Sequence, residues 1–271
     1  MNIPLIGLGT WGMGGKYEED RSNYKESVEI LKAGLNIGFR LIDTAEMYGR
    51  GLSEKIVGEA IKDFRREDIF IITKVWKDNL EYNAVIEAAK SSLKRLGVNY
   101  IDLYLIHWST ENPLTKEMPL SETMRALEYL VDKKLIRYIG VSNANVKLLK
   151  EAENNLNLVK LAANQIEYNL INQEGDNEVI PYCEKNNIKI IAHRPLAKGK
   201  LVLQDNEVIK LLVKKYKKTP FQIALNWIMA QNIIPMPKAG NINHLRENYG
   251  ALGWRMDSKD VELIKRTNFI N

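Results

Sequence analysis

Short apolar runs alternate with amphipathic stretches along the whole chain. Residues 69–72, for example, are apolar at every position, which is typical of a strand covered on both faces. Such runs predict seven strands and a weaker eighth, at Phe39–Thr44, Ile69–Val75, Tyr100–His107, Ile136–Ser142, Leu161–Ile166, Ile188–His193, Ile233–Lys238 and, weakest, Ala251–Trp254. Strands that alternate with helical patterns indicate βα units and a parallel sheet.

The stretches between these strands have helical spacing and recognisable ends. An apolar stripe begins at Tyr24, continues to Leu35 and stops before Gly38. Farther along the chain, Thr219 is followed by a proline and, three residues on, by Gln222. This arrangement predicts a helix that begins with a capping box.

The chain has 271 residues, which fits one large domain or two smaller ones. No linker rich in proline, glycine or serine divides it, so we expect a single α/β domain over residues 1–271, a (β/α)8 TIM barrel. Two segments lie outside the alternation. Residues 2–10 are expected to form a short β-hairpin at the barrel floor, and residues 111–120 a long loop after the third predicted strand.

The charges are interleaved along the chain. The 39 basic and 34 acidic residues give a formal net charge of +5. The lysine-rich run at 214–218 is typical of a solvated helix end, so we expect no nucleic-acid partner.

The single cysteine, Cys183, excludes a disulfide framework within the chain and favours a reducing compartment. No stretch has the ~20 apolar residues that a membrane span needs, and residues 1–20 lack the pattern of a signal peptide. We therefore expect a cytoplasmic protein with no membrane contact, as a monomer or small homo-oligomer.

Four reactive side chains lie at or just beyond the ends of neighbouring predicted strands. Asp43 is near the end of the first, Tyr48 follows in the next loop, Lys74 closes the second and His107 the third. Ligands of a TIM barrel bind at this end of the strands. Each residue alone also fits an ordinary role, as a turn aspartate, a packing tyrosine, a surface lysine or a core histidine. Four of them on one rim favour a catalytic group.

The chemistry of the group centres on Tyr48. A free tyrosine has a pKa of about 10, and a nearby Lys74 ammonium is expected to lower it. Asp43 would keep Lys74 charged, and His107 would bind the oxygen of a substrate carbonyl as hydride attacks. No metal site is expected, because the three histidines lie on separate segments without suitable carboxylates. An aldolase that forms a Schiff base on Lys74 is an alternative.

The chain resembles the aldo-keto reductase family over essentially its whole length. The matching segments are Gly7–Trp11, Asp43–Gly49, Thr73–Val75, Asp102–Trp108, Gly140–Asn143, Asn164–Asn169, Pro195–Leu196 and Pro237–Lys238. The resemblance implies NAD(P)H-dependent reduction of aldehydes or ketones to alcohols, or the reverse oxidation, with a catalytic tetrad of Asp43, Tyr48, Lys74 and His107. An alternative is a non-enzymatic nicotinamide-binding regulatory subunit on the same fold, against which the intact tetrad argues.

The resemblance also implies a cofactor site. Ser142, Asn143 and Gln165 would hold the nicotinamide carboxamide, the segment 196–200 would receive the pyrophosphate, and Lys238 would lie near a 2′-phosphate. The complete expected set is Thr10, Trp11, Ser142, Asn143, Gln165, His193, Leu196, Lys198, Lys200, Lys238, His244, Arg246, Glu247 and Asn248. Trp11, Trp76 and Trp108 are expected to wall the substrate pocket, although each also fits ordinary barrel packing.

This chain departs from the family pattern at several positions. His193 stands where many members stack a tyrosine on the nicotinamide, Ala239 replaces a hydroxyl residue, and His244 replaces a common arginine. NADP(H) is the expected cofactor if Arg246 reaches the 2′-phosphate, with NAD(H) as the alternative. Family members often carry a long C-terminal loop over the pocket. None follows the last predicted helix here, so we expect an open pocket and broad substrate acceptance.

One motif is misleading. Residues 7–12 spell the G-x-G-x-x-G dinucleotide fingerprint, but the polar stretch at 15–20 does not read as the helix that the fingerprint requires. We interpret the motif as a turn at the barrel floor and a rim segment.

Overall fold

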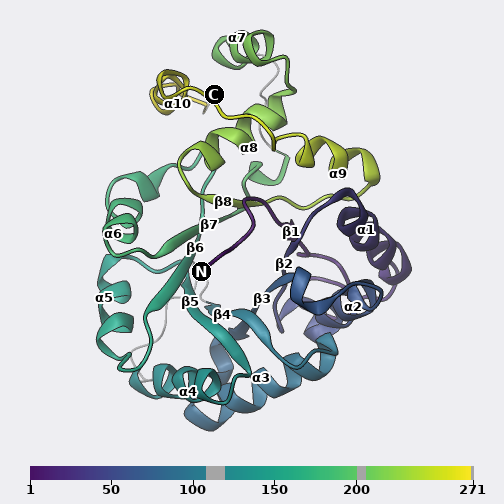
Figure 1. Ribbon diagram of the computed structural model, residues 1–271, viewed down its shortest axis with the longest axis vertical. Coiled ribbons are helices and arrows are strands. Elements are labelled where there is room, and N and C mark those ends of the chain that lie inside the picture. Colours follow the sequence, from purple (N-terminus) through teal and green to yellow (C-terminus); the bar gives the residue numbers. More distant parts are fainter. Residues whose placement is uncertain (108–119, 200–205, 270–271) are drawn as a thin grey trace.

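The chain folds into an eight-stranded parallel barrel surrounded by helices. The computed structural model describes residues 1–107, 120–199 and 206–269. Within them the strands follow one another around the sheet in chain order, from β1 to β8 (Figure 1). The backbone N–H groups of Gly7 and Gly9 donate to the carbonyls of Pro235 and Pro237, each at 3.1 Å. These bonds join the first strand to the last, and the (β/α)8 barrel is confirmed.

The strands are β1 (Leu8–Gly9), β2 (Leu41–Asp43), β3 (Phe70–Trp76), β4 (Ile101–His107), β5 (Ile136–Ser142), β6 (Leu161–Glu167), β7 (Lys189–His193) and β8 (Ile234–Met236). The helices are α1 (Tyr24–Ile37), α2 (Leu52–Ile61), α3 (Tyr82–Leu96), α4 (Leu120–Asp132), α5 (Val146–Asn154), α6 (Val179–Lys185), α7 (Glu207–Tyr216), α8 (Pro220–Ala230), α9 (Ile242–Tyr249) and α10 (Ser258–Lys265). As the sequence predicts, α8 begins with a capping box formed by Thr219 and Gln222.

Two strand predictions are wrong. No hairpin forms in residues 2–10; instead Leu8–Gly9 is the first barrel strand and pairs in parallel with β2. A strand of two residues is too short to show a hydrophobic period, so the pattern could not reveal it. The segment 251–254 is a turn, and the carbonyls of Ala251 and Trp254 accept from the Asn226 side chain, both at 2.9 Å.

Two hydrophobic layers hold the barrel together. The inner layer fills the barrel with side chains such as Leu103, Leu105 and Ile191, all fully buried. Met1 and Ile3 pack against this layer, so the N-terminal segment does reach the barrel interior, although not as a hairpin. The outer layer lies between the strands and the helices. Because the barrel interior is filled, its two ends are separate surfaces.

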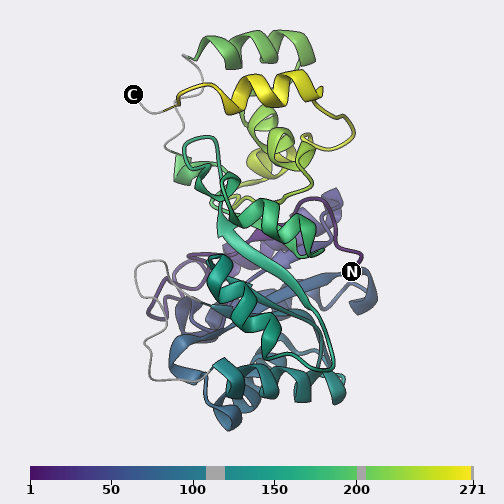
Figure 2. The same cartoon turned by 90° about the vertical axis from the view of Figure 1, so that its left-hand side faces the viewer.

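Helices α7 and α10 lie outside the ring, against α8 and against each other (Figures 1 and 2). The Lys215 ammonium joins the end of α7 to α10 through Asp260, at 2.6 Å. This part of the chain therefore adds a layer beside the barrel and does not belong to its strand ends.

Candidate active site

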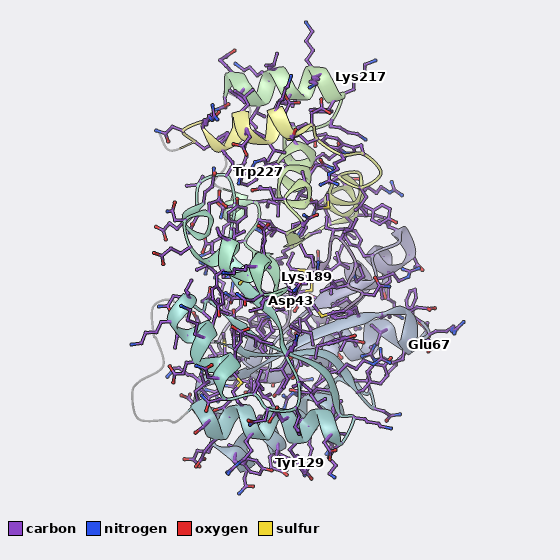
Figure 3. All side chains as sticks on the ribbon, turned by 60° about the vertical axis from the view of Figure 1, so that its left-hand side comes forward. Asp43, Glu67, Tyr129, Lys189, Lys217 and Trp227 are labelled. Carbon is purple, nitrogen blue, oxygen red and sulfur yellow. The ribbon has the colours of Figure 1, made fainter. Side chains whose placement is uncertain are left out.

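A buried lysine lies at the centre of the tetrad that the sequence predicts. Lys74, on β3, is fully buried, and its Nζ donates to Asp43 Oδ1 at 2.7 Å, to the Thr44 carbonyl at 2.8 Å and to the Tyr48 hydroxyl at 3.5 Å. An ammonium group has three N–H donors, and each has an oxygen partner here. Figure 3 shows Asp43 in the interior of the molecule, where the strands converge.

The aspartate is held on both its side chain and its backbone. Gln165 Nε2, from β6, donates to Asp43 Oδ1 at 3.0 Å. The backbone N–H and the hydroxyl of Thr10 both donate to the Asp43 carbonyl at 3.0 Å. The Thr10 hydroxyl in turn accepts from Ser53 at 2.8 Å. Thr10 is fully buried, so its side chain supports Asp43 from behind, and its predicted cofactor contact stays a prediction.

Aromatic rings surround Tyr48. Its ring lies 4.8 Å from Trp11 and 5.6 Å from His107, and His107 lies 5.1 Å from Trp76, all edge to face. Tyr17 continues this series with its ring 5.5 Å from Trp11. Tyr17 could not be predicted from the sequence, because a tyrosine in a polar loop carries no periodic signal. The tetrad and two of the predicted pocket tryptophans therefore come together at one rim, whereas Trp108 lies outside the described residues.

Burial controls the protonation of Tyr48. It raises the pKa of the phenol, and the nearby Lys74 charge only partly offsets this effect. The expectation that Lys74 brings the pKa below its ordinary value is therefore wrong, because the loss of hydration outweighs the attraction. Burial lowers the pKa of Lys74, but attraction to Asp43 and the hydrogen bonds to Asp43 and Tyr48 more than compensate, so its pKa is raised. At neutral pH the pair is a neutral phenol beside an ammonium ion.

His107 is a neutral imidazole. Burial, followed by the charge of Lys74, holds its pKa well below the ordinary value. Its Nδ1 is buried without a hydrogen-bond partner among the described residues. A neutral imidazole can donate one hydrogen bond, and the edge-to-face contact with Tyr48 places the ring beside the phenol.

The predicted nicotinamide-binding residues gather at the ends of β5, β6 and β7. The Ser142 hydroxyl and the Asn143 backbone N–H both donate to the Gln165 carbonyl, at 3.1 and 2.7 Å. His193 Nε2 lies 3.0 Å from Asn143 Oδ1. Burial, with the charges of Arg194, Lys74 and Lys198, lowers the pKa of His193 to about 3, so the ring is neutral and donates to the amide oxygen. Asn143 has a φ of 58°, a left-handed conformation that asparagine tolerates.

The loop after β7 carries strained backbone. Arg194, Ala197 and Lys198 have φ values of 51°, 47° and 57°. Such angles are uncommon outside glycine and cluster at functional sites. Leu196 and Lys198 lie in this loop, as predicted for a pyrophosphate-binding segment, while Lys200 lies outside the described residues.

The predicted adenosine-binding residues lie after β8 and along α9. Lys238 reaches back over the β1–α1 loop, since a Cβ added to Gly12 would be 3.4 Å from its Nζ. Partial burial and the charge of Lys16 lower the pKa of Lys238. On α9, the side chains of His244 and Arg246 are exposed, while Glu247 is half-buried and Asn248 is buried. The two basic residues on α9 are thus free to meet solvent, and their contact with a cofactor stays a prediction.

One cavity, of about 370 Å³, opens at the opposite end of the barrel from Tyr48. Asn2, Arg40 and Arg137 are among its lining residues. The buried Asp102 carboxylate beside it is already paired, with Arg66 at 2.6 Å and with Arg137 at 3.0 Å. The same carboxylate accepts from the Ile71 backbone N–H at 2.9 Å, so Asp102, on β4, links β3 and β5 at this end of the barrel.

The described residues contain neither a membrane-spanning helix nor a cluster of metal-ligating side chains. No helix there has the length and apolar character that crossing a membrane requires. Nor do three or more histidine, cysteine, aspartate or glutamate side chains in these ranges gather as metal ligands would.

Comparisons with known proteins agree with this geometry. Methylglyoxal reductase YeaE of Escherichia coli (strain K12) is 34% identical over 270 residues, 98% of this chain and 91% of that protein. The thermostable aldo-keto reductase Tm1743, solved with the inhibitor epalrestat, has a TM-score of 0.90 at 39% identity, with 97% of this chain and 94% of that chain covered. An aldo/keto reductase from Klebsiella pneumoniae, solved with NADP and acetate, has a TM-score of 0.85 at 30% identity, with 97% and 91% covered. The model of the Aldo/keto reductase family matches residues 5–268, and this chain belongs to that family.

Proposed function

We propose that this protein reduces small aldehydes and ketones to alcohols, with NADPH as the hydride donor and Tyr48 as the proton donor. Carbonyl reduction is the activity that the family and its reductase relatives support. The observation that carries the role of Tyr48 is the buried Lys74 ammonium, 3.5 Å from the phenol and 2.7 Å from Asp43.

The residues at the rim fit a nicotinamide cofactor, which supplies the hydride when bound. Asn143 and Gln165 bring amide groups to the strand ends, and both side chains are already held in place by neighbours. The loop with left-handed backbone at Ala197 and Lys198 would lie against the pyrophosphate, and the Lys198 side chain would supply positive charge there. Lys238 and Arg246 supply positive charge for a 2′-phosphate, which favours NADP(H). A similar protein has been solved with NADP, in agreement with this choice.

The residues of the tetrad would have three roles in the transfer of the proton. Tyr48, neutral at physiological pH, gives its hydroxyl proton to the carbonyl oxygen. The resulting phenolate is stabilised by the adjacent Lys74 ammonium, which Asp43 keeps charged. His107, also neutral, donates a hydrogen bond to the same oxygen and so orients the carbonyl. In the reverse direction Tyr48, as phenolate, would accept the alcohol proton.

The aromatic rings around Tyr48 favour substrates whose carbonyl end is small and flat. Trp11 and Trp76 bracket the tetrad, and Tyr17 extends the apolar wall outward with 62% of its surface exposed. We propose reactive aldehydes as the substrate class, including 2-oxoaldehydes such as methylglyoxal, the substrate in the name of a 34% identical relative. We further propose that the protein works in the cytoplasm, as a monomer or small homo-oligomer.

Steady-state oxidation of NADPH and of NADH with a panel of carbonyls tests this proposal. The panel contains methylglyoxal, benzaldehyde and a simple ketone. We expect turnover of the aldehydes and a lower KM for NADPH than for NADH. No oxidation of either cofactor with any carbonyl would contradict the assigned activity, and activity on one aldehyde alone would contradict an open pocket.

A further inference from the structure

An arginine from the outer ring of helices reaches one buried and one largely buried carboxylate behind the candidate active site. Arg95 lies near the end of α3. Its Nε donates to Glu54 Oε2 at 2.6 Å, and its Nη2 is 3.9 Å from Glu46 Oε2. The Glu54 side chain is fully buried and that of Glu46 is 10% exposed. The Arg95 guanidinium thus interacts with both the Glu54 and the Glu46 carboxylate. Little water reaches this region, so these electrostatic interactions are strong.

The two carboxylates hold β3 on both sides of Lys74. Glu54 Oε1 accepts from the hydroxyl of Thr73, the residue before Lys74, at 2.6 Å. Glu46 Oε1 accepts from the backbone N–H of Trp76, two residues after Lys74, also at 2.6 Å. The position of the Lys74 backbone is therefore fixed by carboxylates on either side of it.

The same carboxylates also flank Tyr48 along the chain. Glu46 precedes it by two residues, and Glu54 lies on α2, which begins directly after the short helical turn Tyr48–Gly51. The network therefore joins the segment that carries the phenol to the strand that carries the ammonium. The 3.5 Å separation between Lys74 Nζ and the Tyr48 hydroxyl depends on how these two segments sit relative to each other.

Two glycines make room for this connection. At Gly51, with a φ of 86°, a Cβ would lie 2.5 Å from both Cδ and Nε of Arg95, so the arginine crosses the turn at a position without a side chain. At Gly58, on α2, a Cβ would lie 2.5 Å from the Leu96 carbonyl oxygen. Helices α2 and α3 approach closely because neither position carries a larger residue.

We propose that Arg95 is a positioning residue for the proton-transfer pair. By holding Glu46 and Glu54 together it keeps the Tyr48 hydroxyl within reach of Lys74, although it touches neither substrate nor reacting atoms. The inference rests on the proposed role of Tyr48 as proton donor. Loss of the arginine should slow the chemical step, because a small displacement of a reacting group lowers the rate steeply, and should leave cofactor binding intact.

The test compares Arg95→Met, Arg95→Lys and the control Arg65→Met in NADPH-dependent reduction of methylglyoxal. Arg65 is 73% exposed and pairs with Glu67 on the surface. We expect Arg95→Met to lower kcat by roughly tenfold or more, with the aldehyde KM and the NADPH Kd within about twofold of wild type. Arg95→Lys should recover part of the lost kcat, and the control should match wild type. Wild-type kcat in Arg95→Met, or kcat and NADPH affinity falling together, would overturn the proposal.

Arg95→Met leaves the Glu54 carboxylate buried without its partner, and it can unfold for that reason. The double variant Arg95→Met/Glu54→Gln removes this charge and keeps a group that can accept the Thr73 hydrogen bond. It should show the same loss of kcat at a melting temperature close to that of the wild type; wild-type kcat in this variant also overturns the proposal. A wild-type protein that reduces no carbonyl defeats the proposed function itself and the inference with it.

Discussion

Replacing Lys74 by methionine isolates the electrostatic support of the phenol. The Lys74 ammonium lies 3.5 Å from the Tyr48 hydroxyl, and both groups are buried. At an effective dielectric constant of about 20, unit charges at this distance attract each other by about 5 kcal/mol. That energy corresponds to roughly three pKa units or more in the stability of the phenolate. If most of this attraction is present in the transition state of proton transfer, its loss in Lys74→Met lowers kcat roughly 10³-fold.

Single-turnover oxidation of bound NADPH by methylglyoxal measures this effect, because it separates the chemical step from product release. The control is Lys90→Met, which removes a lysine that is 52% exposed and pairs with Glu87 on the surface of α3. The control should react at the wild-type rate. A Lys74→Met rate within tenfold of the wild type would refute the reasoning, because the ammonium would then contribute little to proton transfer.

A double variant separates the effect of Lys74 on stability from its effect on catalysis. Without Lys74 the Asp43 carboxylate, 6% exposed, loses its charged partner, and breaking a buried pair costs about 3–5 kcal/mol. The double variant Asp43→Asn/Lys74→Met removes the stranded charge, so urea unfolding should show most of the lost stability restored. The rate should stay low. Recovery of both stability and rate would mean that Lys74 acts only as a structural residue.

Two further predictions concern His193 and Lys238. The folded-state pKa of His193, about 3, lies below the unfolded value of about 6.5, so its share of stability is lost as the pH falls through this interval, by about 2 kcal/mol between pH 7 and pH 5. Between pH 7 and pH 5, the free energy of unfolding in urea should therefore fall by about 2 kcal/mol less in His193→Gln than in the wild type. The same pH dependence in both proteins would contradict the assigned pKa. Lys238→Met should raise the Kd for NADPH roughly tenfold, the size of one hydrogen bond to a charged group, and leave that for NADH unchanged. Equal weakening of both cofactors would argue against a 2′-phosphate contact.

The sequence could predict that Asp43, Tyr48, Lys74 and His107 lie together, because strand ends meet at one rim of a parallel barrel. Asp43 and Lys74 lie on β2 and β3, which are hydrogen-bonded neighbours, so a pattern that locates the strands also brings the residues together. The same reasoning could not locate β1, because its two residues show no period. It also placed an eighth strand at 251–254, where apolar residues pack in a turn.

The energetic balance at Tyr48 could not be read from the sequence. Residue types show that Lys74 lowers the phenol pKa, but the opposing effect of burial depends on how completely the folded chain excludes water. The contact of Arg95 with Glu54 joins residues 41 positions apart on two outer helices, and no local pattern reports it. Tyr17 lies in a polar loop, where no hydrophobic period marks a residue that faces the site.

The central claim is that Tyr48 hands its proton to the carbonyl oxygen. Tyr48→Phe removes the hydroxyl and keeps the ring between Trp11 and His107. The direct measurement is single-turnover reduction by this variant, with the NADPH Kd obtained from the quenching of protein fluorescence. We predict a rate loss of roughly 10²-fold or more with an unchanged Kd. A wild-type rate, or an equal loss of rate and cofactor binding, would contradict the account.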